Sequence, residues 1–277
     1  MPVVLALIAA LSWGISDFLG GTLSKRHGAW VTAIAVQVGA VVSTAAAAFA
    51  LGGSPTASDW LWGSASGLGV GLGTAFLFRG LSTGRMGVVA PISAVGSALV
   101  PVAVGLVTGE RPGLLAAVGI VAAIPGIWLI AASADGSQAS APSTGIMDGA
   151  IAGLGFGAGF ACLDRVSPAA GLLPLVSEQV VSLVPVILLA LLTRQAFWPR
   201  TRSAWTAAWL GPLGTVANAC LLWAIQAGML SVVSVLVSLY PAATVALAAI
   251  VLRERIHRAQ WVGLALAGVA VGLISVP

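Results

Sequence analysis

Ionisable and amide side chains are rare in this chain, and those inside long apolar segments include Asp17, Gln37, Arg79 and Glu178. A charged group within a bilayer costs roughly 2.5–3.5 kcal/mol, so each of these groups is expected to face a polar cavity or a partner. A carboxyl group in such a place can take up and release a proton during a reaction cycle. Glu178 is therefore the first candidate for proton coupling, and Asp17 is the second. The alternative for Glu178 is a structural carboxyl group, protonated or hydrogen-bonded to an amide.

Three of these side chains are expected at one membrane depth. Asp17 lies about four residues before the end of the first apolar segment, Gln37 about seven residues into the second, and Arg79 at the end of the third. One interpretation is a cluster of these three side chains that faces a cavity. The alternative is that Asp17 and Arg79 reach the membrane interface or form a structural pair. Glu178 occupies the place of Gln37 in the second half of the chain, at an offset near 141 residues.

Aromatic and amide side chains supply the other candidates for a cavity: Trp13 in the first segment, Asn218 and Trp223 in the eighth, and Tyr240 in the ninth. Aromatic rings beside a cavity can stack on a flat or apolar substrate. Tyr240 is the only tyrosine, and it precedes Pro241, where a helix loses one backbone hydrogen bond and exposes a carbonyl group. Trp223 fits an anchoring position at the membrane interface equally well.

Two acidic residues precede an arginine at the end of a long apolar segment, Glu110 before Arg111 and Glu254 before Arg255. Helix C-termini repel acids, so a neighbouring arginine is needed there. We assign these pairs a structural role, as charged helix ends that pack on neighbouring loops.

Enzymatic chemistry is not indicated by the remaining residues. The two histidines lie in basic connections, and the two cysteines belong to no metal-ligand set and to no nucleophile–base set. A glycine-rich phosphate loop followed by Lys and Ser or Thr is also missing. The sequence therefore predicts neither an enzyme nor an ATP-driven pump, and it predicts no metal and no cofactor.

The composition explains why polar groups inside apolar segments matter. Of the 277 residues, 59% are hydrophobic and only 7% are charged, against about 25% charged residues in an ordinary soluble domain. So few charges cannot cover a soluble protein, two cysteines exclude a disulfide-rich scaffold, and the apolar content excludes disorder. The net charge of +4 rests on too few residues to indicate nucleic acid as a partner. The chain is predicted to be an integral membrane protein whose partner is the lipid bilayer.

Ten apolar segments are long enough to cross a bilayer as helices, which requires roughly 20 residues each. They cover residues 2–21, 30–50, 60–79, 87–108, 113–133, 146–163, 172–193, 205–226, 230–252 and 258–276. None of them alternates apolar and polar residues as a barrel strand would. The predicted fold class is all-α, with about ten transmembrane helices.

The chain divides into two halves of five segments each, residues 1–134 and 145–277. The stretch 135–144 between them is small, polar and rich in Gly, Ser and Pro, which is typical of a linker. At an offset of 144 residues, Glu110–Arg111 coincides with Glu254–Arg255. Because five is an odd number, two equivalent halves in series must have opposite orientations in the membrane. This arrangement is an inverted repeat, the recurrent plan of secondary transporters.

Several residues of this pattern also occur in a known family. Trp13–Gly14 stands in the first segment with Lys25 after it, and Pro241 stands 13 residues before Glu254, whereas Ser97 replaces the equivalent proline in the first half. With these residues the whole chain resembles the ten-helix, EamA-type members of the drug/metabolite transporter superfamily. The resemblance implies transport of a small metabolite, often its export, through a cavity between the halves. It also implies a multi-pass protein of the bacterial inner membrane.

We therefore expect a secondary active transporter that moves a small-molecule substrate by alternating access, coupled to protons and functional as a monomer. The alternatives are an uncoupled facilitator or channel, and a structural membrane subunit. Ten basic residues lie at the ends of the first, third, seventh and ninth segments, and two lie on the opposite side. The positive-inside rule then places both termini outside the cytoplasm, whereas the resemblance implies cytoplasmic termini.

Overall fold

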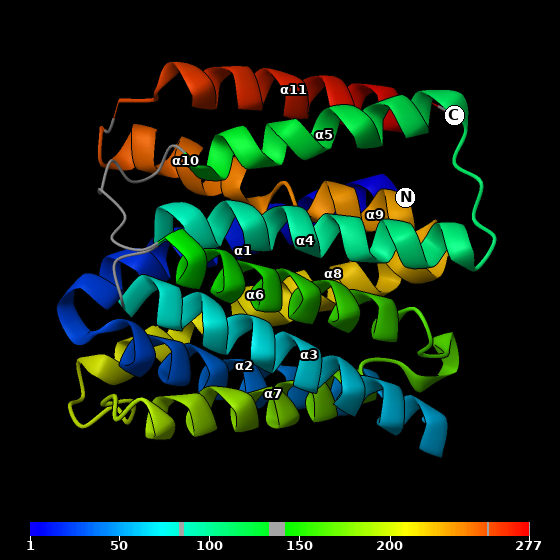
Figure 1. The fold of residues 1–277 in the computed structure, drawn as a ribbon. Helices are drawn as coiled ribbons and strands as arrows, with labels where there is room; N and C mark the ends of the chain where they lie inside the picture. The colour runs from blue at the N-terminus through cyan, green and yellow to red at the C-terminus, as the bar shows by residue number, and fades with distance from the viewer. Residues whose placement is uncertain (83–85, 133–141, 254, 277) are drawn as a thin grey trace.

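The computed structural model describes residues 1–82, 86–132, 142–253 and 255–276. Its first half contains α1 (Pro2–His27), α2 (Ala29–Leu51), α3 (Ala57–Ser82), α4 (Met86–Val107) and α5 (Leu114–Ala132). Its second half contains α6 (Pro142–Leu163), η1 (Pro168–Ala170), α7 (Leu173–Leu192), η2 (Ala204–Leu210), α8 (Gly211–Ala227), α9 (Leu230–Val237), α10 (Tyr240–Val251) and α11 (Arg258–Ser275). Every regular element in this described part is helical, and ten segments are long and apolar enough to cross a membrane (Figure 1). The predicted all-α membrane fold is confirmed.

The first helix is longer than the sequence analysis predicts, because α1 ends at His27 instead of near residue 21. Gly20 and Gly21 are both helical and do not end it. The helix stops at Gly28, whose φ of 87° lies in the left-handed region that glycine adopts without strain. Asp17 consequently lies near the middle of α1 rather than in its last turn.

The ninth membrane segment, predicted as one helix over 230–252, is interrupted just before Pro241. Helix α9 ends at Val237, and α10 begins at Tyr240 with Pro241 in its first turn. Proline has no N–H group, so the carbonyl group one turn before it keeps no helical partner. The break leaves two short helices: α9 packs mainly on α4, α10 packs mainly on α1, and both also contact α5.

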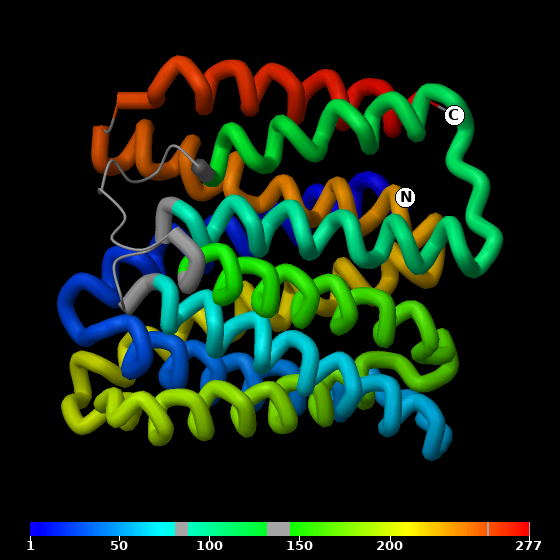
Figure 2. The backbone as a smooth tube through the Cα atoms, viewed as in Figure 1, coloured from blue at the N-terminus to red at the C-terminus, as the bar shows by residue number. Residues whose placement is uncertain are grey.

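Helices from the two halves of the chain are interleaved. The most extensive contacts of α1 are with α8 and α10, and those of α6 are with α3 and α4. Helices α5 and α11 pack against each other at one edge of the molecule (Figure 1). Helix α1 begins and α11 ends at the same end of the bundle (Figure 2). We call this end the terminal end, and the end where α1 passes into α2 the opposite end.

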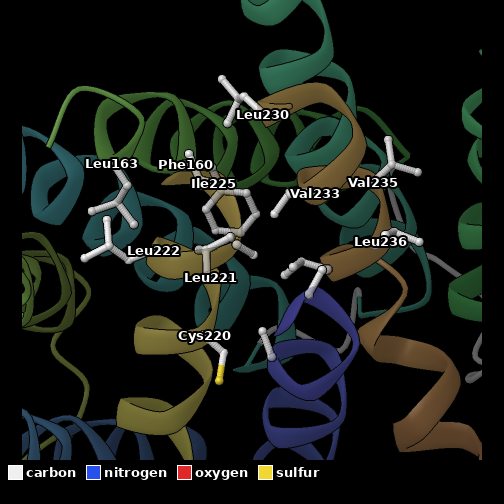
Figure 3. Close-up of a cluster of buried hydrophobic side chains, with 14 of the residues drawn as sticks. Phe160, Leu163, Cys220, Leu221, Leu222, Ile225, Leu230, Val233, Val235 and Leu236 are labelled. Atoms are coloured by element: carbon white, nitrogen blue, oxygen red, sulfur yellow. The ribbon is translucent and has the colours of Figure 1, made fainter. Parts of the chain in front are cut away.

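The core is built from medium-sized apolar side chains and close helix contacts. Figure 3 shows Phe160 of α6 together with Leu221 and Leu222 of α8 and Leu236 of α9 in one buried cluster. Helices α4 and α6 approach until Gly96 and Gly153 face each other, where a methyl group on Gly153 would lie 2.9 Å from the Gly96 Cα atom. Small residues allow such close approach between membrane helices.

Candidate functional site

A cavity of about 780 Å³ opens at the opposite end of the molecule. Its wall comes from the C-terminal part of α1, the first residues of α2, the segment after α7, α10 and the first turn of α11. Both halves of the chain therefore line the cavity. Its volume suits a small metabolite, since ligand pockets commonly measure about 300–1,000 Å³.

Asp17 is the acidic group of this cavity. It is exposed to the cavity although it lies near the middle of a membrane helix. Among the lining residues that the structure describes, Asp17 alone carries a carboxyl group, whereas Lys25 and Arg255 carry positive charges. Of the eight side chains proposed from the sequence as cavity residues, Asp17 alone belongs to this described lining.

The inner boundary of the cavity is a direct contact between α1 and α10. The Thr244 hydroxyl group donates a hydrogen bond to the Gly14 carbonyl group at 3.1 Å. A methyl group on Gly14 would lie 2.7 Å from the Tyr240 carbonyl oxygen, so the two helix backbones touch at this point. The missing side chain at Gly14 and the hydroxyl group at Thr244 bring α1 and α10 into contact, and this contact closes the cavity one turn beyond Asp17.

Three aromatic rings lie directly beyond this contact. Trp13 of α1 stacks on Phe160 of α6 with a centroid distance of 5.6 Å and an interplanar angle of 11°. Trp13 also meets Tyr240 of α10 edge-on, with a centroid distance of 6.4 Å and an angle of 80°. Trp13 and Tyr240 were both proposed from the sequence, whereas Phe160 was not. The aromatic cluster joins both halves of the chain between the cavity and the terminal end.

Asp17, Gln37 and Arg79 do not form the cluster that one interpretation of the sequence predicted. Gln37 and Arg79 each have a partner on a different helix, and Asp17 lines the cavity. The Gln37 amide group donates a hydrogen bond to the Ser182 hydroxyl group of α7. The Arg79 Nε atom lies 3.7 Å from the Asp148 carboxylate of α6, whose side chain is 2% exposed. Asp148 was missed in the sequence analysis, although an acidic residue inside a long apolar segment is itself a signal.

Glu178 is buried between α3 and α7, away from the described cavity wall, and is 1% exposed. The Ser66 hydroxyl group donates a hydrogen bond of 3.3 Å to its Oε1 atom. Its Oε2 atom has no hydrogen-bond partner within the described ranges. An ionised carboxylate accepts several hydrogen bonds and is costly to bury without them. The position therefore does not stabilise the ionised form.

Glu110 connects the two halves at the terminal end. Its Oε1 atom accepts a hydrogen bond of 2.5 Å from the Leu230 backbone N–H group, and its Oε2 atom accepts one of 3.0 Å from Ser231. These N–H groups belong to the first turn of α9, where a helix favours a negative charge. Arg111 donates to the Leu106 carbonyl group at 3.2 Å, at the end of α4. Glu254, the equivalent of Glu110, lies outside the described residues, whereas Arg255 lines the cavity.

Asp59 forms a second connection at the terminal end and was also missed in the sequence analysis. It stands in the first turn of α3 and is 2% exposed. Its carboxylate accepts hydrogen bonds from the Ser167 backbone N–H group at 2.8 Å and from the Thr56 backbone N–H group at 2.7 Å. The connection before α3 is thereby fixed to the connection after α6.

The remaining candidates from the sequence do not gather at a second site. Asn218 is buried in α8 with 6% exposure, whereas Trp223 of the same helix is 40% exposed on the outer surface. Within the described ranges, no three His, Cys, Asp or Glu side chains come close enough together to hold a metal ion.

Comparisons with known proteins agree with this architecture. Residues 1–132 and 143–276 both match the EamA-like transporter family. No curated protein matches the chain. One solved crystal structure shares the fold with a TM-score of 0.73 at 18% identity, over 99% of this chain and 96% of that one. The family match covers nearly the whole sequence, and the chain therefore belongs to the EamA-like transporter family, a family of multi-pass membrane transporters of small molecules.

Proposed function

We propose that the protein is a secondary transporter that moves a small metabolite by alternating access, with the substrate site between its two halves. The observation that carries this proposal is the cavity, which both halves line and which reaches Asp17 from the opposite end. Hydrogen bonds of Glu110 and Asp59 join the halves at the terminal end. The family match to residues 1–132 and again to 143–276 supports a division into repeats 1–134 and 145–277, joined by the linker 135–144.

The proposed direction of transport is export. Basic residues follow α1, α7 and α10 at the end where the cavity opens. The positive-inside rule places such an end in the cytoplasm. A substrate would then enter the cavity from the cytoplasm and leave at the terminal end, once the contacts there have opened.

Coupling to protons is assigned to Asp17 and Glu178. Asp17 faces the cavity and can exchange a proton with water or with a cationic substrate. Glu178 is buried with one hydroxyl partner, so its ionisation must accompany a change in its surroundings. A carboxyl group that changes its protonation only when helices move can link proton flux to the conformational cycle.

The test is substrate-induced proton movement in proteoliposomes, with amino acids, sugars, nucleobases and organic cations as substrates. We expect one class to move protons, and we expect Asp17→Asn or Glu178→Gln to abolish that signal. Asp164→Asn is the matched control, because Asp164 is a carboxyl group beyond the end of α6 that does not belong to the described cavity wall. If both carboxamide variants keep the proton signal, the assignment of coupling is wrong.

The same vesicles separate the proposal from its alternatives. A carrier shows saturable flux and counterflow, in which unlabelled substrate on one side drives labelled substrate from the other. Flux without counterflow would indicate a channel. Absence of flux for every class, in folded protein, would favour a structural membrane subunit and overturn the proposal.

A further inference from the structure

The charged side chains on the cavity wall are separated by sign. Asp17, Gly21 and Lys25 are spaced by four residues on one face of α1, and all three line the cavity. Eight residues of helix correspond to about 12 Å along the axis. Lys25 therefore lies near the mouth, and Asp17 lies inside. Gly21 between them adds no side chain, and a Cβ atom built there would find open space.

The mouth of the cavity is rich in donors for an anion. Arg255, in the connection before α11, lines the cavity together with Lys25. Trp30 of α2 also belongs to the wall and is only 3% exposed. Its indole N–H group has no acceptor among the described residues. A buried donor without an acceptor costs free energy, and a carboxylate bound at the mouth would remove that cost once the indole ring turns towards the cavity, because the nitrogen atom itself is buried.

An apolar surface lies between the two charged regions. Val245, Ala248 and Ala249 are spaced by three and four residues, which places them on one face of α10, and all line the cavity. This surface offers contact to methylene groups and no hydrogen bonds. The wall therefore presents a carboxylate at Asp17, the apolar face of α10 with the Thr22 and Ser24 hydroxyl groups of α1 beside it, and a cationic group at Lys25.

We propose that the cavity binds a linear zwitterion whose ammonium and carboxylate groups are separated by a short aliphatic chain. This inference rests on the proposed function, since it names the substrate class of the same cavity. The ammonium group pairs with Asp17. The carboxylate group pairs with Lys25 and Arg255 and accepts a hydrogen bond from the Trp30 N–H group. A simple amine leaves the mouth without its anion, and an α-amino acid is too short to reach both charged regions.

The experiment measures binding to the purified protein in lipid nanodiscs by calorimetry, which does not depend on transport. The probes are glycine, γ-aminobutyrate and ε-aminocaproate, with hexylamine and caproate as analogues that each lack one charge. We expect ε-aminocaproate to bind about tenfold more tightly than either analogue, because both charged ends contribute. Glycine should bind most weakly of the three zwitterions.

Variants locate the carboxylate end of the ligand. Lys25→Gln should reduce the preference for ε-aminocaproate over hexylamine about threefold, because Arg255 and Trp30 remain, and should leave hexylamine binding unchanged. Arg26→Gln is the matched control, because Arg26 is an exposed neighbour outside the cavity wall. Trp30→Phe keeps an aromatic ring, although one smaller than the indole, and removes the N–H group, so it should weaken only the ligands that carry a carboxylate.

Two results would overturn the inference. If hexylamine binds the unmodified protein as tightly as ε-aminocaproate, the mouth does not recognise a carboxylate. If Lys25→Gln and Arg26→Gln change the preference equally, the cavity wall is not the binding site. Vesicles that still transport another compound would leave the proposed function standing, so failure of the two proposals can be told apart.

Discussion

The Glu110 carboxylate accepts a hydrogen bond of 2.5 Å from the backbone N–H group of Leu230 and thereby caps a helix in the other half of the chain. Glu110 follows α4, and Leu230 begins α9. The contact combines a hydrogen bond with the favourable charge at a helix N-terminus. Any conformation that opens the terminal end by separating these segments must break it.

Glu110→Gln should therefore favour opening of the terminal end. The amide keeps one acceptor and loses the negative charge, which costs roughly 1–2 kcal/mol at a helix N-terminus. Spin labels at the exposed positions Val107 and Trp223 should report a larger population of long distances. Arg111→Gln is the control, because Arg111 donates its hydrogen bond to a carbonyl group at the end of α4, in its own half of the chain. Equal distance distributions for Glu110→Gln and the unmodified protein would contradict the prediction.

Asp59→Asn should destabilise the protein, since the Asp59 carboxylate accepts hydrogen bonds from backbone N–H groups in two connections. The amide can point only one acceptor at these donors, and a buried donor left without an acceptor costs about 1–3 kcal/mol. Thermal unfolding in detergent measures the loss. Ser58→Ala, at an exposed neighbouring position, should leave the unfolding temperature nearly unchanged. A loss of the same size in both variants would show that the Asp59 hydrogen bonds are not responsible.

Gly14→Ala should impair transport, and Gly20→Ala should not. A methyl group on Gly14 would lie 2.5 Å from the Ala243 Cβ atom and would push α1 away from α10. A methyl group on Gly20 meets nothing within 4 Å, and alanine is favoured over glycine in a helix by about 1 kcal/mol. Initial rates of counterflow in proteoliposomes separate the two variants. Unchanged rates in Gly14→Ala would mean that the contact between α1 and α10 plays no part in the cycle.

Glu110→Gln should also lower the pKa of Asp164, which lies in the connection after α6. Partial burial raises the pKa of Asp164 above its ordinary value of 3.8, the positive charge of Arg165 opposes this, and the negative charge of Glu110 adds to it. Removing the Glu110 charge makes ionisation of Asp164 easier, whereas Arg165→Gln should make it harder. Carbon NMR of labelled aspartate, followed through a pH titration, measures both shifts. A rise in the pKa of Asp164 after Glu110→Gln would contradict the assignment of the neighbouring charge.

The fold could be predicted because it depends on the length and polarity of segments. Ten apolar segments fix ten membrane spans. The break at Pro241 between α9 and α10 was not predicted, because prolines also lie inside the unbroken helices α4 and α7. The end of α1 was predicted too early, because Gly20 and Gly21 are tolerated inside a helix that ends only at Gly28.

The arrangement of the site was harder to predict because depth along a helix does not determine which neighbour a side chain faces. Asp17, Gln37 and Arg79 were placed at one depth from the sequence, but Gln37 bonds to Ser182 and Arg79 pairs with Asp148. These partners lie more than 60 residues away in sequence, and the rotation of each helix is set by packing. The role of Glu110 at α9 depends on the same long-range packing.

The interleaving of the two halves has a consequence for biosynthesis. The main contacts of α1 are with α8 and α10, so the first helix to leave the ribosome waits in the bilayer until about 200 more residues have been inserted. A fragment that stops after α5 would expose to lipid the faces of α1, α3 and α4 that the second half covers. Two separately synthesised fragments, cut between the halves, should therefore be degraded when made alone and should rescue each other when made together.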